Sequence, residues 1–231
     1  MDLPELDADL DPAEVVAAIA PLLLPERAAR LDAAARGRLL GLTVVMEEML
    51  DPHNYGAVLR SCESMGLGRV YAINEHNRFR VSPRVTQGCE RWLDIERFAD
   101  PERCLAAARA AGYRVLAAVP GAALTLDAID PAARHALCFG NEHLGLSPRL
   151  RALADGEFAI PMFGLSQSLN VSVAVAVSIA AVASARRRAL GTSGDLSEPE
   201  VLRLRARFYA ADVRGHRAIV ARAAADRRLR T

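Results

Sequence analysis

Three short polar segments of the sequence could do chemistry, and each follows a run of apolar residues. They read DPHNYGAVLR at 51–60, FGNEHLGLS at 139–147 and IPMFGLSQSLN at 160–170. Amides, carboxylates and hydroxyls at the end of a buried strand need partners, because an unpaired buried polar group is unfavourable. Those partners are either backbone groups or a ligand. Taken singly, each segment also fits an ordinary turn from a strand into a helix.

The elements around these segments alternate between strand and helix. LTVVMEEM, RVYAIN, YRVLAAV, HALCFG and EFAIP are typical of strands, while residues 56–65, 101–111 and the small apolar run after Asn170 favour helices. This order predicts an α/β fold, an open and mostly parallel sheet with helices on both faces. Ligands of such sheets bind outside the carboxyl ends of the strands, so the three polar segments are expected to meet there.

Two helical extensions flank this region. We expect an extension over 1–40, the sheet domain over 41–190 and a second extension over 191–231. The first sixteen residues hold six acids and no base, whereas 186–231 hold twelve Arg against five acids. A basic tail suits a polyanion, and a solvated helical face is the alternative. Ser197 followed by Glu200 predicts a capping box at the start of the last helical segment.

Several classes of protein are disfavoured. The four cysteines are far apart and form no C-x-x-C pair, so neither a zinc site nor a disulfide framework is indicated, no metal is expected, and a reducing cytoplasm is the expected setting. The first residues lack the pattern of a signal peptide, and Ser172 and Ser178 interrupt the long apolar run, so we expect no membrane span. No strand is followed by G-x-G-x-x-G, which disfavours a Rossmann dehydrogenase.

The three segments together match a family. N-x-G-x-x-x-R at Asn54, Gly56 and Arg60, G-x-E at 140–142, and IPM followed by QSLNVS at 160–172 resemble the three motifs of the SpoU class of knotted (SPOUT) RNA 2′-O-methyltransferases. The resemblance covers about residues 26–190. Within that class the chain is most similar to the TrmH branch of tRNA guanosine 2′-O-methyltransferases. One departure is His143 and Leu144 after the second motif, where many relatives have a basic and an aromatic residue.

The resemblance implies an activity and an assembly. The methyl donor would be S-adenosylmethionine, the chain would be a homodimer, and the third motif would thread through the sheet as a C-terminal trefoil knot. The substrate would be a tRNA, with a D-loop guanosine as the expected target. Two alternatives stay open: an rRNA substrate within the same class, and a catalytically silent knotted module that binds RNA.

The resemblance also implies roles for particular residues. Arg60 would serve the attack of the ribose 2′-hydroxyl, and since an Arg is effectively always protonated, we favour a role in clamping a phosphate and lowering the pKa of the hydroxyl. Asn54 would hold the first loop, Asn170 would pair with Asn54 or Glu142, and Glu142 would orient Arg60 or a substrate donor. The alternative is a structural role, in which Arg60 forms an ion pair with Glu63 or Glu47. The positions implied for the methyl donor are Gly140, Asn141, Ile160, Met162, Ser168 and Leu169.

Contact with RNA is expected from arginines outside the three motifs. Phosphate contacts give affinity without sequence information and make binding depend on salt. The candidates are Arg27, Arg30, Arg36, Arg80, Arg84, Arg186 and Arg187, with the tail behind them.

Overall fold

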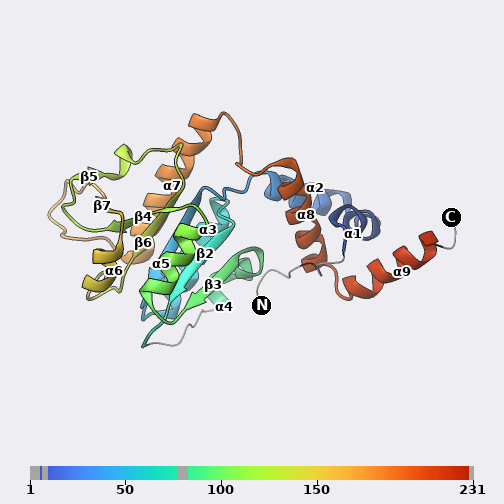
Figure 1. Ribbon diagram of the computed structural model, residues 1–231, viewed down its shortest axis with the longest axis horizontal. Helices are drawn as coiled ribbons and strands as arrows, with labels where there is room; N and C mark the ends of the chain where they lie inside the picture. The colour runs from blue at the N-terminus through green and yellow to red at the C-terminus, as the bar shows by residue number, and fades with distance from the viewer. Residues whose placement is uncertain (1–5, 7–9, 77–82, 229–231) are drawn as a thin grey trace. The chain divides into compact units, whose positions relative to one another are not determined.

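The computed structural model describes residues 6, 10–76 and 83–228, and the chain divides into two compact units (Figure 1). One unit is continuous, Leu39–Thr192. The other combines the two ends of the chain, Met1–Arg38 and Ser193–Thr231. The two extensions that the sequence separates therefore belong to a single unit.

Within the described residues of the continuous unit, seven strands form one parallel sheet in the order β3-β2-β1-β6-β4-β7-β5. The predicted parallel α/β sheet is confirmed. The strands are β1 (Leu42–Glu47), β2 (Arg69–Ile73), β3 (Asp94–Phe98), β4 (Arg114–Ala118), β5 (Leu124–Thr125), β6 (His135–Phe139) and β7 (Gly156–Ala159).

Helices cover both faces of this sheet (Figure 1). One apolar core joins a sheet face to α3 (Pro52–Ser64) and α7 (Val171–Leu190), and a second core joins the other face to α5 (Pro101–Ala110) and α6 (Pro148–Leu153). Central strands buried on both sides need continuous apolar runs, and all six residues of β1 are buried. Short elements complete the unit: α4 (Pro83–Thr86), η2 (Cys89–Trp92) and η3 (Leu126–Ala128).

The strand order reverses direction between β1 and β6. From β1 the chain builds outward through β2 and β3, whereas β6 lies on the opposite side of β1 and leads to β4, β7 and β5. Because all strands are parallel, the segments that follow β1 and β6 leave the same edge of the sheet side by side. Such a switch point is the usual ligand position in an open α/β sheet.

The terminal unit is helical. It contains α1 (Pro12–Ile19), η1 (Ala20–Leu22), α2 (Pro25–Arg36), α8 (Glu198–Asp212) and α9 (His216–Arg228). The predicted capping box is present, since the Ser197 backbone N–H and Oγ both lie within 2.8 Å of Glu200 Oε2. Ion pairs of Arg27 with Asp212 and of Arg36 with Glu198 connect the early helices to α8.

Two local expectations are wrong. Helix α3 begins at Pro52 instead of near Gly56, because Asp51 caps it by accepting from the His53 N–H at 2.8 Å. Asn54 therefore lies in the first turn of a helix and not in a loop. The last helical segment, which the sequence predicts to continue to about Ala225, is instead divided. Helix α8 ends at Asp212 and α9 begins at His216, with Gly215 at φ +73° in the left-handed region between them.

Candidate functional site at the β1/β6 switch point

A chain of hydrogen bonds joins the three polar segments. Asn54 Nδ2 donates to Glu142 Oε1 at 2.8 Å, and Asn170 Nδ2 donates to Asn54 Oδ1 at 3.3 Å. Glu142 follows β6, Asn54 lies at the start of α3 after β1, and Asn170 lies between β7 and α7. Residues 28 to 116 positions apart in the sequence are thus brought to one edge of the sheet, as the reversal of strand order predicts.

Asn170 has two functions in this geometry. Its Oδ1 accepts from the Ser172 backbone N–H at 2.9 Å, which makes Asn170 the N-cap of α7, while its Nδ2 reaches Asn54. One side chain therefore both starts the long helix and ties it to the first segment. Of the two partners that the resemblance implies for Asn170, Asn54 and Glu142, the structure has Asn54, and the capping of α7 is a further role.

Glu142 is held in its ionised form. Partial burial raises the pKa of its carboxyl, but the hydrogen bond from Asn54 and backbone N–H groups, including that of Leu50 at 3.2 Å, lower the pKa overall. An ionised carboxylate can only accept hydrogen bonds. Glu142 therefore orients the amide of Asn54. Of its two expected partners, Arg60 and a substrate donor, Arg60 is not hydrogen-bonded to it in the described part of the chain.

Arg60 lies apart from this hydrogen-bond chain. It is exposed on α3, and within the described part of the protein it makes no hydrogen bond and no ion pair. The alternative in which it pairs with Glu47 or Glu63 is thus not found, and Glu47 is buried and bonded to Ser147 instead. A fully charged guanidinium without a protein partner is available to a phosphate.

The segment 140–147 is folded tightly on itself. Asn141 and Gly145 exchange two backbone hydrogen bonds of 2.9 and 3.0 Å, and Gly145 has φ +70°. A Cβ added to Gly140 would lie 2.2 Å from the Gly145 carbonyl carbon, so no side chain fits there. The glycine at 140 is required by this close approach of the backbone.

Both polar atoms of the Asn141 side chain are hydrogen-bonded within the protein. Its Oδ1 accepts from the N–H groups of His143 and Leu144, and its Nδ2 donates to the Glu48 carbonyl at 3.0 Å. Its backbone N–H and carbonyl are bonded to Gly145, so Asn141 acts first of all to hold the fold of this segment. Glu48 itself has φ +50°, a strained conformation for a residue with a side chain.

The segment 161–170 is exposed throughout and forms no helix or strand. Ile160 is half-buried and packs against the core under α3 and α7, whereas Met162 and Leu169 are 40% and 36% exposed. Ser168 is exposed as well. The segment therefore presents apolar side chains together with the backbone groups of 161–169, which have no backbone partner among the described residues, and this suits a ligand with an aromatic base and polar edges.

The arginines expected to contact RNA fall into different environments. Arg186 is 6% exposed, and its Nη1 donates to the carbonyls of Pro131, Ala132 and Ala133, so the prediction that it binds RNA is wrong. Arg187 donates to the Met65 carbonyl. Arg27 and Arg36 are in ion pairs, Arg30 and Arg84 are exposed, and Arg80 lies outside the described residues.

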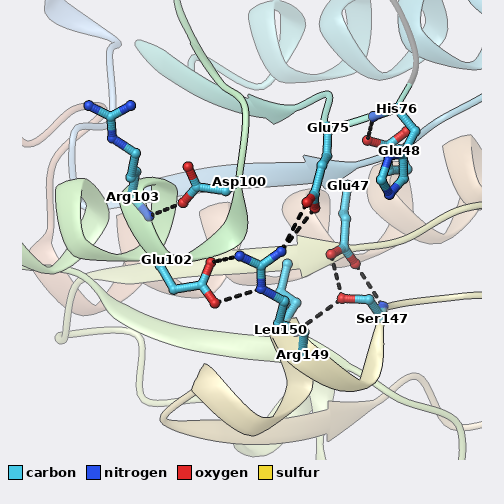
Figure 2. A network of polar contacts seen from close by, with 10 residues as sticks. All are labelled: Glu47, Glu48, Glu75, His76, Asp100, Glu102, Arg103, Ser147, Arg149 and Leu150. Atoms are coloured by element: carbon cyan, nitrogen blue, oxygen red, sulfur yellow. Dashed lines mark hydrogen bonds and ion pairs between the residues drawn. The ribbon is translucent and has the colours of Figure 1, made fainter.

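Two residues beside the site were not identified from the sequence as functional. Glu47 and Ser147 form a buried contact that connects β1 to the end of segment 139–147 (Figure 2). The available signal was Ser147 before Pro148, an N-cap residue followed by Pro at the first helical position. In the described ranges, no group of three or more His, Cys, Asp or Glu side chains is placed to hold a metal ion, and no helix is long and apolar enough to cross a membrane.

Solved structures share this architecture. The Aquifex aeolicus TrmH/SpoU tRNA modifying enzyme superposes with a TM-score of 0.72 at 28% identity, over 81% of this chain and 97% of that chain. An AdoMet-bound rRNA methyltransferase from Sinorhizobium meliloti gives a TM-score of 0.56 at 26% identity, over 64% of this chain and 56% of that chain.

Curated sequences give a similar picture. A tRNA (guanosine(18)-2'-O)-methyltransferase of Aquifex aeolicus is 28% identical over 195 residues, 83% of this chain and 92% of that protein. The protein of the same name from Escherichia coli K12 is 31% identical over 64% of this chain and 65% of its own length. The model of the SpoU rRNA Methylase family matches residues 41–180, which include all three polar segments. The chain therefore belongs to the SpoU rRNA Methylase family.

Proposed function

We propose that this protein transfers a methyl group from S-adenosylmethionine to the 2′-hydroxyl of a tRNA ribose, with a D-loop guanosine as the target. The observation that carries the proposal is the hydrogen-bond chain Asn170–Asn54–Glu142 at the switch point. It joins the three family motifs into one site. The tRNA guanosine methyltransferases from A. aeolicus and E. coli support the choice of substrate.

The residues at the site fit such a donor. Exposed backbone and apolar side chains of the segment after Ile160 would hold it, among them Met162, Ser168 and Leu169, together with the tight turn that begins at Gly140. When bound, S-adenosylmethionine supplies a methyl group carried by a sulfonium. No pyrophosphate has to be held, so a glycine-rich phosphate loop is not needed.

Arg60 assists the attack of the ribose 2′-hydroxyl, which is the nucleophile. A ribose 2′-hydroxyl is a weak nucleophile at neutral pH, and its attack is helped when the negative charge that develops on the oxygen is stabilised. Arg60 clamps a neighbouring RNA phosphate and lowers the pKa of the hydroxyl. Asn54, held between Glu142 and Asn170, fixes the start of the helix that carries Arg60.

RNA binding is assigned to exposed arginines. Arg30 on α2, Arg84 on α4 and the tail residues Arg203, Arg214 and Arg222 are exposed, and each can contact phosphates. These contacts position the RNA and carry no base information.

The assembly is proposed to be a homodimer with a trefoil knot, located in the cytoplasm. Support for a second copy comes from the exposed apolar side chains of the third segment and α7, where Phe163 is 98%, Val173 46% and Val177 42% exposed. Large exposed apolar side chains on neighbouring segments are typical of an interface. The knot is inferred from family membership.

The experiment is a methyl-transfer assay with labelled S-adenosylmethionine and unmodified transcripts of tRNA and of rRNA. The proposal expects label in the tRNA, and comparison of total RNA from cells with and without the gene should place the lost 2′-O-methyl group on a D-loop guanosine. Label in rRNA alone would instead support the second candidate, which the family description and the S. meliloti structure favour. Absence of transfer to any RNA would leave the silent RNA-binding module.

A further inference from the structure

The carboxylate of Glu47 is buried at the end of the central strand β1, where it is 4% exposed. Both of its oxygens contact one residue: Oε2 accepts from the Ser147 backbone N–H at 2.8 Å and Oε1 accepts from Ser147 Oγ at 2.6 Å (Figure 2). A buried carboxylate is costly unless it is fully hydrogen-bonded. Glu47 therefore holds Ser147 at a fixed distance from β1.

Ser147, held by Glu47, in turn fixes the start of helix α6. Its Oγ also accepts from the Leu150 backbone N–H at 3.0 Å, which makes Ser147 the N-cap of α6. Ser147 is at the same time the last residue of the segment that begins with Gly140. The contact with Glu47 thus fixes both the start of α6 and the end of segment 140–147.

The beginning of the same segment is held by Glu48, the residue that follows Glu47 in the chain. Asn141 Nδ2 donates to the carbonyl of Glu48, whose positive φ turns that carbonyl toward the segment. Between these two attachments lies Glu142, which accepts from Leu50 and Asn54. Residues 47–50 thus bind segment 140–147 near its start, at Asn141 and Glu142, and at its end, at Ser147.

We propose that Glu47 is a positioning residue for the methyl-donor site, and that its contact with Ser147 sets the conformation in which segment 140–147 receives S-adenosylmethionine. The inference rests on the proposed function, since it assigns that donor to the segment. Glu47 does not touch the donor and acts through Ser147. Its loss should therefore change donor affinity more than RNA affinity.

The test uses the full-length protein and four variants. Glu47→Met removes both acceptors at similar volume, Ser147→Ala removes the hydroxyl, the double variant removes both groups, and Ser147→Thr keeps a hydroxyl. Calorimetry gives the Kd for S-adenosylmethionine, filter binding gives the Kd for tRNA, and steady-state kinetics separate KM for the donor from kcat.

We expect Glu47→Met and Ser147→Ala each to weaken donor binding roughly tenfold, the effect of losing a hydrogen bond to a charged group. The double variant should be no weaker than the weaker single variant, because the two residues act as one unit. Ser147→Thr should bind like the wild type, and the Kd for tRNA should change little throughout.

The matched control is Glu102→Gln. Arg149 on α6 is bonded to Glu75 and Glu102, and Figure 2 draws no bond from either of these carboxylates to Ser147. This variant loosens α6 without touching Ser147, so its donor affinity should stay near that of the wild type. If Glu102→Gln weakens donor binding as much as Glu47→Met, the effect is a general loosening of α6 and the proposal is overturned.

The outcomes separate this inference from the proposed function. If the wild type binds no S-adenosylmethionine, the proposed function fails first. If the wild type binds it and folded Glu47→Met binds equally well, only the positioning role is overturned. Should Glu47→Met fail to fold, Ser147→Ala decides in the same way, with unchanged affinity overturning the role.

Discussion

Asn54 and Glu142, 88 positions apart in the sequence, are joined by a hydrogen bond of 2.8 Å. The bond crosses the switch point of the sheet, from the first turn of α3 to the segment that follows β6. Because the other amide atom of Asn54 accepts from Asn170, the orientation of this one side chain depends on all three motifs. A substitution that breaks a hydrogen bond in one motif should therefore alter the side-chain positions in the other two.

The first prediction concerns the pH dependence of stability. The folded-state pKa of Glu142 lies below its ordinary value of 4.5, against the effect of burial and because of the bonds from Asn54 and the backbone. A carboxyl with a lowered folded-state pKa stabilises the fold above its unfolded pKa, and this contribution is lost as the pH falls below 4.5 and through the folded value. Glu142→Gln lacks that contribution at every pH.

Denaturant unfolding of the wild type and of Glu142→Gln between about pH 6 and pH 3 measures this pH-dependent contribution of Glu142 to stability. The wild type should be the more stable protein at the upper end, and the difference between the two free energies of unfolding should shrink toward the lower end. A difference that stays constant over this range would contradict the bonding of Glu142 described above.

The second prediction is that Gly140→Ala disrupts the segment 140–147. The added Cβ would lie 2.2 Å from backbone atoms of Gly145, and backbone cannot move aside as the end of a flexible side chain can. We expect the free energy of unfolding to fall by about 1–3 kcal/mol, as for an overpacked site, together with weaker binding of the methyl donor.

The control is Gly164→Ala, where a Cβ meets nothing within 4 Å and should leave the thermal midpoint unchanged. Thermal unfolding of both variants and donor calorimetry of Gly140→Ala are sufficient. A stable Gly140→Ala protein with normal donor affinity would show that the segment relaxes without cost.

Five strands, β1, β2, β4, β6 and β7, could be predicted from the sequence because they are mainly apolar runs separated by helices, whereas β3 is largely charged and β5 has only two residues. The meeting of the three polar segments followed from their common position at strand ends. The start of α3 was placed too late because Asn54 was read as part of a loop, although Asp51 before Pro52 is a typical N-cap pattern.

Other features depend on contacts that local sequence does not contain. Glu47 looks like any acid at the end of a strand, and only the fold brings it to Ser147, 100 positions later. Arg186 sits in a basic run that is typical of a phosphate-binding tail. Its burial follows from the approach of α7 to Gly41, where a Cβ would lie 2.0 Å from Arg186 Nη2.

The third prediction separates structural from RNA-binding arginines. Arg186→Met leaves the carbonyls of residues 131–133 without their donor, so the free energy of unfolding should fall by about 1–3 kcal/mol. Because Arg186 is buried, the salt dependence of tRNA binding should not change in protein that remains folded.

Charge reversal of the exposed Arg214 and Arg222 should affect RNA binding and not stability, in contrast to Arg186→Met. Stability should change little, while tRNA binding weakens and the slope of log K against log salt becomes shallower, since fewer counterions are released. Filter binding over a salt series measures both slopes. An unchanged slope for the Arg214→Glu/Arg222→Glu variant would show that the tail is not the RNA-binding surface.

The fourth prediction concerns Arg60, which is exposed and, within the described residues, not bonded to the hydrogen-bond chain. Arg60→Ala should lower kcat for methyl transfer by about 10²–10³-fold, the usual effect of removing one electrostatic stabiliser of a developing oxyanion. The Kd for S-adenosylmethionine should stay unchanged, because Arg60 supports neither segment 140–147 nor segment 160–170.

Arg60→Lys is the informative companion variant. It keeps the positive charge but loses the planar fork that can grip a phosphate with two hydrogen bonds, so it should regain only part of the activity. Full activity of Arg60→Ala would remove Arg60 from the mechanism. Loss of donor binding in the same variant would instead place Arg60 at the donor site, and the role of phosphate clamp would then be wrong.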